Sequence, residues 1–164
     1  MTDVADHTAT TPRPSGVTRP LTLGPAELQR LLPHSWPFLL LDRVTSLEPG
    51  VRAVGVKCVT NTEWPFAGHF PGRPIFPGVL LIEAAAQLCG IVAGTAATDG
   101  DSAPRIGYLA SVKQFRLRVP VEPGDQVHIE AVHERTHGAL SQFRITERAN
   151  GRTCANGVVM IGLG

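Results

Sequence analysis

The stretch "GHFPGRPIFPGVLLIEAAAQLCG", residues 68–90, decides the fold and holds two side chains capable of proton chemistry. From Gly78 to about Thr95 the chain lacks proline and is apolar on nearly every side, which predicts one long buried helix. Pro77 precedes it, where its fixed φ suits a helix start. A helix of this kind must be covered on most sides by the rest of the protein.

Strand-like segments supply that cover. A short amphipathic helix is predicted over residues 24–33, and residues 61–77 contain four prolines and two glycines, which predicts a long ordered loop without regular elements. The strand-like runs are residues 38–44, 51–60, 105–119, 125–135, 139–149 and 152–163. We therefore predict an α+β fold in which a curved antiparallel sheet of five or six strands wraps around one long central helix.

Composition bounds the organisation of the chain. Its 164 residues predict one domain over residues 21–164, preceded by a disordered tail, residues 1–20, which lacks the apolar core of a signal peptide. A net charge of +1 gives no general case for nucleic acid or an anionic membrane. The three cysteines lack metal-ligand spacing, so we expect no metal and reduced thiols in a cytoplasmic protein. We also expect no cofactor. Charged and polar interruptions make the long helix a core helix rather than a membrane span.

A polar stripe interrupts the apolar helix. Glu83 and Gln87 are four residues apart and share one face, which small residues such as Ala86 and Gly90 continue. Burial disfavours the charged form of a carboxylic acid, so an acid here can hold a proton and donate it. The alternative is a purely structural acid that is hydrogen-bonded to Gln87, and the residues alone do not decide between the two.

Two further groups lie near the start of this helix. Gly78 presents an unobstructed N–H at the positive end of the helix, where an oxygen that gains negative charge can bind. His69 lies in the proline-stiffened loop, and its imidazole has the basicity needed to remove a proton near neutral pH. A base, an acid and an anion-binding N–H within fifteen residues predict proton removal next to a carbonyl with expulsion of a hydroxyl.

At these residues the sequence resembles the 3-hydroxyacyl-[acyl-carrier-protein] dehydratases, which have the hotdog fold. The resemblance covers residues 24–162 and is carried by three motifs in the family's order. They are "LLPHSWPFLLLDRV" at 31–44, "GHFPGRPIFPGVLLIEAAAQ" at 68–87 and "YLASVKQFRLRVPVEPGDQV" at 108–127. Glu at position 83 resembles the branch that only dehydrates, rather than the branch that also isomerises.

The resemblance implies a mechanism and an assembly. His69 of one subunit would face Glu83 of another across a dimer, which in this family is often part of a trimer of dimers. His69 would act as the base, Glu83 as the acid, Gly78 as the thioester-oxygen donor, and Gln87 would orient Glu83. The substrate would be a (3R)-3-hydroxyacyl chain on acyl carrier protein and the product a trans-2-enoyl chain.

Residues outside the proton chemistry are also candidates. The resemblance implies that Phe76 and Tyr108 contact substrate. Local positive charge predicts docking of an acidic carrier protein. The docking candidates are Arg73, Arg105, Lys113, Arg116 and Arg118.

Two departures from the family pattern suggest a specialised enzyme. Phe76 stands where Met is common and Ala85 where a bulkier residue is common, which would reshape an acyl tunnel and favours a polyketide or polyene pathway. Two other functions stay open: a hotdog thioesterase, and a non-catalytic acyl-binding subunit of a hetero-oligomeric dehydratase. His34 is expected to brace the turn in its motif, and His128, His133 and His137 are expected to be structural.

Overall fold

The computed structural model of the protein describes residues 21–96 and 107–163. The predicted tail, residues 1–20, and the docking candidate Arg105 lie outside these ranges. In chain order the elements are β1 (Leu21–Leu23), α1 (Pro25–Leu31), β2 (Arg43–Glu48), β3 (Arg52–Cys58), the 3-10 helix η1 (Trp64–Ala67), α2 (Gly78–Ala96), β4 (Gly107–Leu117), β5 (Gln126–His137), β6 (Leu140–Ala149) and β7 (Arg152–Leu163).

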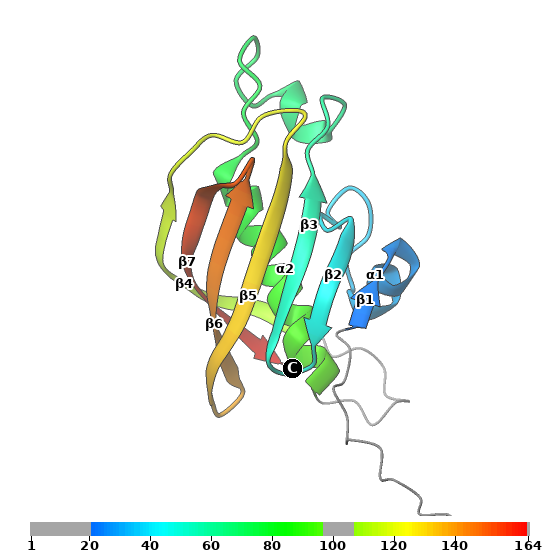
Figure 1. Cartoon of the computed structure of the whole chain (residues 1–164), viewed down its shortest axis with the longest axis vertical. Coiled ribbons are helices and arrows are strands. Elements are labelled where there is room, and N and C mark those ends of the chain that lie inside the picture. Colours follow the sequence, from blue (N-terminus) through cyan, green and yellow to red (C-terminus); the bar gives the residue numbers. More distant parts are fainter. Residues whose placement is uncertain (1–20, 97–106, 164) are drawn as a thin grey trace, which may run out of the picture.

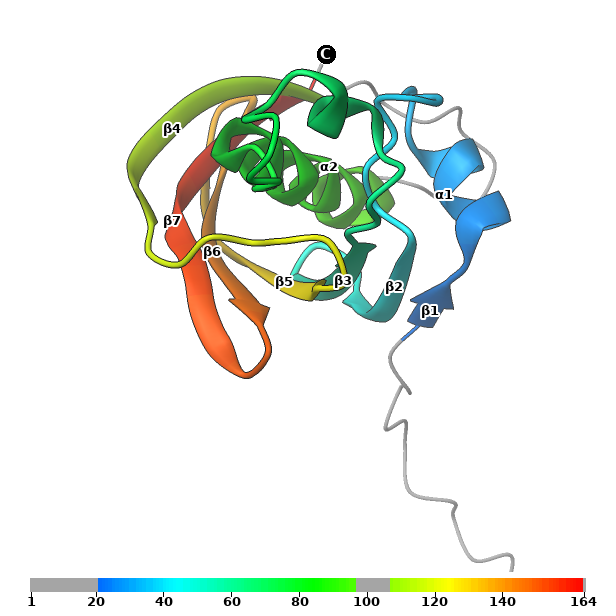
Figure 2. The same ribbon diagram turned by 90° about the horizontal axis from the view of Figure 1, so that it is seen from above.

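The strands form one antiparallel sheet that curves around α2 (Figures 1 and 2). Its order is β1-β2-β3-β5-β6-β7-β4, so the chain leaves the sheet after β3, forms η1, α2 and the far edge strand β4, and returns to pair β5 with β3. The predicted curved sheet around a long central helix is confirmed. The sheet has seven strands in the described residues, not five or six, because the three-residue β1 is too short to show an alternating pattern.

The helix α2 forms the centre of the hydrophobic core. Its side chains Leu88, Ile91 and Val92 are at most 1% exposed and belong to one cluster with apolar side chains from β3, β5, β6 and β7. The helix is long and apolar enough to cross a membrane by length and composition, but most of it is buried inside the protein. The prediction of a buried core helix is therefore confirmed. Replacing one of these large side chains by Ala would cost about 2–5 kcal/mol of folding stability.

Two local predictions were wrong, and each has a physical reason. The loop over residues 61–77 contains the short helix η1, whose first turn accommodates Pro65. The strand predicted from residue 38 begins only at Arg43. Before that point the backbone of Phe38 and Leu40 bonds to a side chain of α2 instead of to a neighbouring strand.

The far edge of the sheet is unusually open. None of the eleven residues of β4 is buried, although this strand pairs along its length with β7. Its exposed large apolar side chains are Tyr108, Leu109, Val112 and Leu117. An unpaired edge with apolar side chains is typical of a surface that pairs with another chain.

Candidate active site

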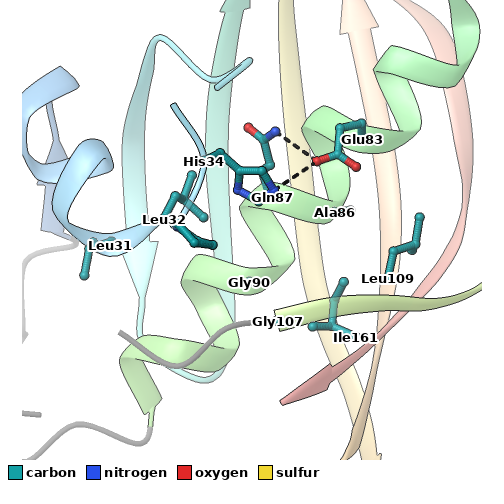
Figure 3. A pocket seen from close by; sticks show the side chains of 11 residues that line it. Leu31, Leu32, His34, Glu83, Ala86, Gln87, Gly90, Gly107, Leu109 and Ile161 are labelled. Atoms are coloured by element: carbon teal, nitrogen blue, oxygen red, sulfur yellow. Dashed lines mark hydrogen bonds and ion pairs between the residues drawn. The ribbon is translucent and has the colours of Figure 1, made fainter. Parts of the chain in front are cut away.

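Glu83 lies on α2 at the wall of a small cavity of about 60 Å3. Its side chain is 19% exposed, and its Oε1 accepts a hydrogen bond of 3.0 Å from Gln87 Nε2 (Figure 3). Ala86 and Gly90 line the same cavity, so the predicted stripe of small residues beside the acid is confirmed. Because Ala86 and Gly90 are small, there is room next to the carboxyl group of Glu83.

Gln87 fixes the position of Glu83. Its side chain is 2% exposed. Besides the bond to Glu83, its Nε2 donates to Phe38 O at 2.7 Å, and its Oε1 accepts from Leu40 N–H at 3.0 Å. The amide is satisfied on both sides and cannot turn without losing bonds to the backbone. Gln87 thus links Glu83 to the backbone of the segment before β2 through hydrogen bonds.

His34 is a neighbour of Glu83 that the sequence did not reveal. Its Nε2 lies 3.5 Å from Glu83 Oε1, and the two side chains line the same cavity (Figure 3). His34 was expected only to brace its turn. It stands in a non-periodic segment far from Glu83 in the sequence, so neither spacing nor helical phase could have found this contact.

His69 is held by its own loop. Its Nδ1 lies 2.7 Å from Ile75 O, and its backbone N–H donates to Pro65 O at 2.9 Å. A carbonyl oxygen only accepts, so Nδ1 carries the hydrogen and Nε2 is left with a free lone pair. Phe70 packs against the imidazole with ring centroids 4.1 Å apart and has a left-handed backbone, φ 55°. In this tautomer Nε2 is the ring nitrogen that is available to accept a proton.

A second, larger cavity of about 350 Å3 opens beside His69. Phe76 and Gly78 line it together with apolar side chains such as Leu81 and Leu117. Gly78 is the first residue of α2, and the first four N–H groups of an α-helix have no acceptor within the helix. The structure thus brings His69, Phe76 and Gly78 to one cavity that can hold an apolar chain ending in a polar group.

The two predicted proton-transfer groups line different cavities of the single chain. Glu83 and Gln87 are at one, and His69 and Gly78 are at the other. Tyr108 is 61% exposed on β4 and lines neither cavity, although Gly107 and Leu109 beside it line that of Glu83. Neither of these two cavities of the single chain is lined by both the predicted base and the predicted acid.

The docking candidates within the described residues are exposed. They are Arg73 in the His69 loop, Lys113 and Arg116 on β4, and Arg118 just beyond it. Arg118 Nε donates to Asn156 Oδ1 at 2.6 Å, which fixes its direction on the surface. Two of these basic side chains thus lie on β4, and Arg118 lines the His69 cavity.

No group of three His, Cys, Asp or Glu side chains is arranged to hold a metal ion in residues 21–96 and 107–163. All three cysteines are free thiols, and Cys89 and Cys154 are buried. Burial raises the pKa of the Cys154 thiol to about 11 and also raises that of Cys89, which keeps both thiols in their unreactive protonated form.

A second interior carboxyl group lies on the sheet. Glu147 on β6 is 0% exposed, and within the described part of the chain neither of its carboxyl oxygens has a hydrogen-bond partner. Burial raises its pKa to about 8, so it is neutral at pH 7. The sequence did contain a signal for this: Phe143, Ile145 and Ala149 alternate with it on the core face of β6.

The sheet, the central helix and the acid on that helix define a protein of the hotdog class. A solved dehydratase heterocomplex, ApeI:P from Xenorhabdus doucetiae, shares the fold with a TM-score of 0.71 and 20% identity, covering 84% of this chain and 90% of that one. The FabA-like domain family matches residues 32–160.

Relatives of known name are much more similar in sequence. The 3-hydroxyacyl-[acyl-carrier-protein] dehydratase FabZ of Syntrophotalea carbinolica is 50% identical over 117 residues, which cover 70% of this chain and 78% of the relative. The protein of the same name from an Anaeromyxobacter species is 46% identical over 131 residues, covering 78% of this chain and 82% of the relative. The chain belongs to the 3-hydroxyacyl-[acyl-carrier-protein] dehydratases, a family of hydro-lyases, as its motifs predict.

Proposed function

We propose that this protein dehydrates (3R)-3-hydroxyacyl-[acyl-carrier-protein] to trans-2-enoyl-[acyl-carrier-protein] in the cytoplasm, as a step of fatty acid synthesis. The observation that carries the proposal is the fixed hydrogen bond from His69 Nδ1 to Ile75 O, because it leaves Nε2 as a base at the apolar cavity of Gly78. The names of the similar relatives supply the substrate class.

The first half of the reaction uses His69 and Gly78. His69 Nε2 removes the proton on the carbon next to the thioester carbonyl. The electron pair of that C–H bond moves toward the carbonyl, and Gly78 N–H at the positive end of α2 stabilises the oxygen that becomes negative. The mostly apolar lining of the cavity offers few competing polar groups, which favours this interaction.

The second half uses Glu83. The bond between the β-carbon and its hydroxyl breaks as the α–β double bond forms, and Glu83 donates a proton to the departing oxygen, which leaves as water. His69 has then gained one proton and Glu83 has lost one. Return of one proton from the imidazolium to the carboxylate resets the site, with substrate converted to enoyl thioester and water.

The base and the acid meet in a homodimer. Within one chain they line separate cavities, and β4 offers an exposed antiparallel edge with apolar side chains that a second copy can cover. We infer that His69 of one subunit faces Glu83 of its partner, and that three such dimers associate as in the family.

Mixing two inactive variants tests the shared site. A His69→Ala chain and a Glu83→Gln chain are each expected to be inactive, but random mixed dimers contain one intact site. Refolding the two together should restore about a quarter of the wild-type turnover, since half of the dimers are mixed and each has one working site of two. No recovery, with dimers verified by light scattering, would place both groups in one chain's site.

Acyl-chain preference follows from the His69 cavity. Phe76 is 2% exposed and lines this cavity, whereas Ala85 is buried in the core and lines neither described cavity. We propose that Phe76 adapts the enzyme to the chains of a polyketide or polyene pathway. Turnover of carrier-bound chains of graded length and unsaturation tests this, and a preference for short saturated chains would exclude it.

We propose that the carrier protein docks on exposed basic side chains. These are Arg73, Lys113, Arg116 and Arg118. Opposite charges attract over about 8 Å at physiological ionic strength, so added salt should raise KM while kcat changes little. A charge-reversed Arg116→Glu variant should show a higher KM at low salt and a weaker salt dependence. A KM that ignores ionic strength in the wild type would contradict this surface.

Mass spectrometry of a 3-hydroxyacyl carrier protein tests the reaction itself. We expect a loss of one water from the acyl group with wild-type protein, and no detectable loss with Glu83→Gln in the time that the wild type needs to convert the substrate. Release of free carrier thiol would instead indicate a thioesterase. Unaltered turnover in purified His69→Ala would indicate a non-catalytic subunit that carries an active contaminant or partner.

A further inference from the structure

His34 and Gln87 approach the same oxygen of Glu83. Gln87 Nε2 donates to Oε1 at 3.0 Å, and His34 Nε2 lies 3.5 Å from that atom (Figure 3). Within the described residues, neither of these two side chains is hydrogen-bonded to Oε2. The arrangement is therefore asymmetric: one carboxyl oxygen faces two nitrogen atoms of its own chain and the other is left for the cavity.

The second ring nitrogen of His34 shows which tautomer is present. Nδ1 is buried and has no hydrogen-bond partner among residues 21–96 and 107–163. A buried N–H without an acceptor costs about 1–3 kcal/mol, and a buried charged one costs more. The favoured ring therefore has a bare Nδ1 and carries its single hydrogen on Nε2, the nitrogen that faces Glu83.

We propose that His34 is a positioning residue for Glu83, an inference that rests on the proposed dehydratase function. Gln87 is hydrogen-bonded to Oε1 and the N–H of His34 faces the same atom, so the proton that Glu83 delivers resides on Oε2, which is left for the substrate. His34 touches no reacting atom. It acts by fixing which oxygen is the acid and in which direction that oxygen points.

The length of the contact fits a role in the chemical step. At 3.5 Å it is longer than a good hydrogen bond in the resting chain. When Glu83 releases its proton, Oε1 gains negative charge and the His34 N–H is drawn to it. An interaction that strengthens as the transition state forms lowers the barrier to turnover and leaves substrate binding nearly unchanged. The expected signature is a change in kcat rather than in KM.

The position of His34 is well defined. Its ring stacks on Phe38 with centroids 6.2 Å apart, and Phe38 O is bound by Gln87. The backbone between them is closed by a bond of 2.8 Å from Phe38 N–H to Ser35 O. A histidine that only braced this turn would contribute to stability, and replacing it would lower kcat no more than it lowers the amount of folded enzyme.

Two polar replacements separate positioning from bracing. Gln is long enough to place an amide N–H near the position of Nε2, whereas Asn is shorter and ends near the position of Nδ1. We expect His34→Gln to keep kcat within about threefold of wild type, and His34→Asn and His34→Phe to lower it by roughly 10- to 100-fold with little change in KM. His128→Phe, a matched change at an exposed histidine of β5, should leave kcat unchanged.

A double variant tests whether His34 acts through Glu83. His34→Asn added to Glu83→Gln should cause no further loss of the residual turnover, because its target is already gone. Full activity of His34→Asn, equal losses in His34→Gln and His34→Asn, or additive losses in the double variant would each overturn the proposal. Failure of the wild type to release water would instead overturn the dehydratase function, so the two failures are distinguishable.

Discussion

Two glutamate side chains enter the protein interior from facing layers, Glu83 from α2 and Glu147 from β6. Glu83 is partly exposed, has a hydrogen bond from Gln87 and borders a cavity. Glu147 is fully buried, and no group in the described residues bonds to its carboxyl oxygens. The comparison shows that burial without a partner raises the pKa of Glu147 to about 8, whereas a hydrogen-bond partner and an adjoining cavity are what the proposed role of Glu83 requires.

The largest expected difference between the two acids is in turnover. Glu83→Gln keeps the shape of the side chain but removes the transferable proton, so kcat should fall roughly 10²- to 10⁴-fold. Glu147→Gln should leave kcat within about threefold of wild type, because Glu147 lines neither of the two cavities of the proposed site. Steady-state dehydration assays on both folded variants check this, and equal losses would remove the distinction between the acids.

The pH dependence of the free energy of unfolding should report the burial of Glu147. Burial raises the pKa of Glu147 to about 8 from an ordinary value of 4.5, so the folded state keeps a proton that the unfolded chain loses. Its contribution is most favourable below pH 4.5 and is lost as the pH rises to about 8. The loss is on the order of 4 kcal/mol across that window.

Urea unfolding at pH 5, 6, 7 and 8 measures this effect. The free energy of unfolding of Glu147→Gln should vary less steeply with pH than that of the wild type, because the side chain no longer titrates. Glu134→Gln serves as the control and should keep the wild-type slope over this range, because the hydrogen bond from Gln142 lowers the pKa of Glu134 and keeps it ionised throughout. Parallel curves for wild type and Glu147→Gln would show that the buried carboxyl group is not the source of the pH dependence.

A smaller effect is expected from removing the partner that Glu83 has and Glu147 lacks. Gln87→Met keeps the volume but leaves Leu40 N–H and Phe38 O without their bonds, which should lower the free energy of unfolding by about 2–3 kcal/mol. The Tm and the urea midpoint measure this.

Gln142→Met is the matched control for that change. Gln142 is also buried, but its bonds go to Glu134 and Arg135, which are exposed and can turn to water. We expect its loss to cost less than about 1 kcal/mol. If Gln142→Met lowers the free energy of unfolding as much as Gln87→Met does, the hydrogen bonds of Gln87 to Leu40 N–H and Phe38 O have no special importance for stability.

The fold could be predicted where the sequence is periodic. The helix predicted from Gly78 to about Thr95 is observed as Gly78–Ala96, and the shared face of Glu83 and Gln87 follows from helical spacing. Strand β2 starts later than predicted, because the preceding backbone bonds to Gln87, and such a tertiary contact leaves no mark in a local pattern.

The candidate site could be predicted only in part. The residue types and spacing of His69, Gly78 and Glu83 indicated the chemistry, but not that they line two separate cavities of one chain. The contact of His34 with Glu83 joins segments that share no periodicity. The alternation of β6 places Glu147 on the core face of the sheet. Acids are rarely buried, however, so the alternation alone does not predict that Glu147 is 0% exposed.

The crossover from β3 to β5 has a consequence for how the molecule forms. The hairpins β5–β6 and β6–β7 join neighbours in sequence and can form early, whereas β3 must pair with β5 across the whole segment that holds η1, α2 and β4. Sheet closure therefore waits for the slowest, longest-range pairing. In pulse-labelled hydrogen exchange during refolding, amides of β6 should be protected before those of β3. The segment that holds His69 and Glu83 lies between β3 and β5, so the sheet closes around it late in folding.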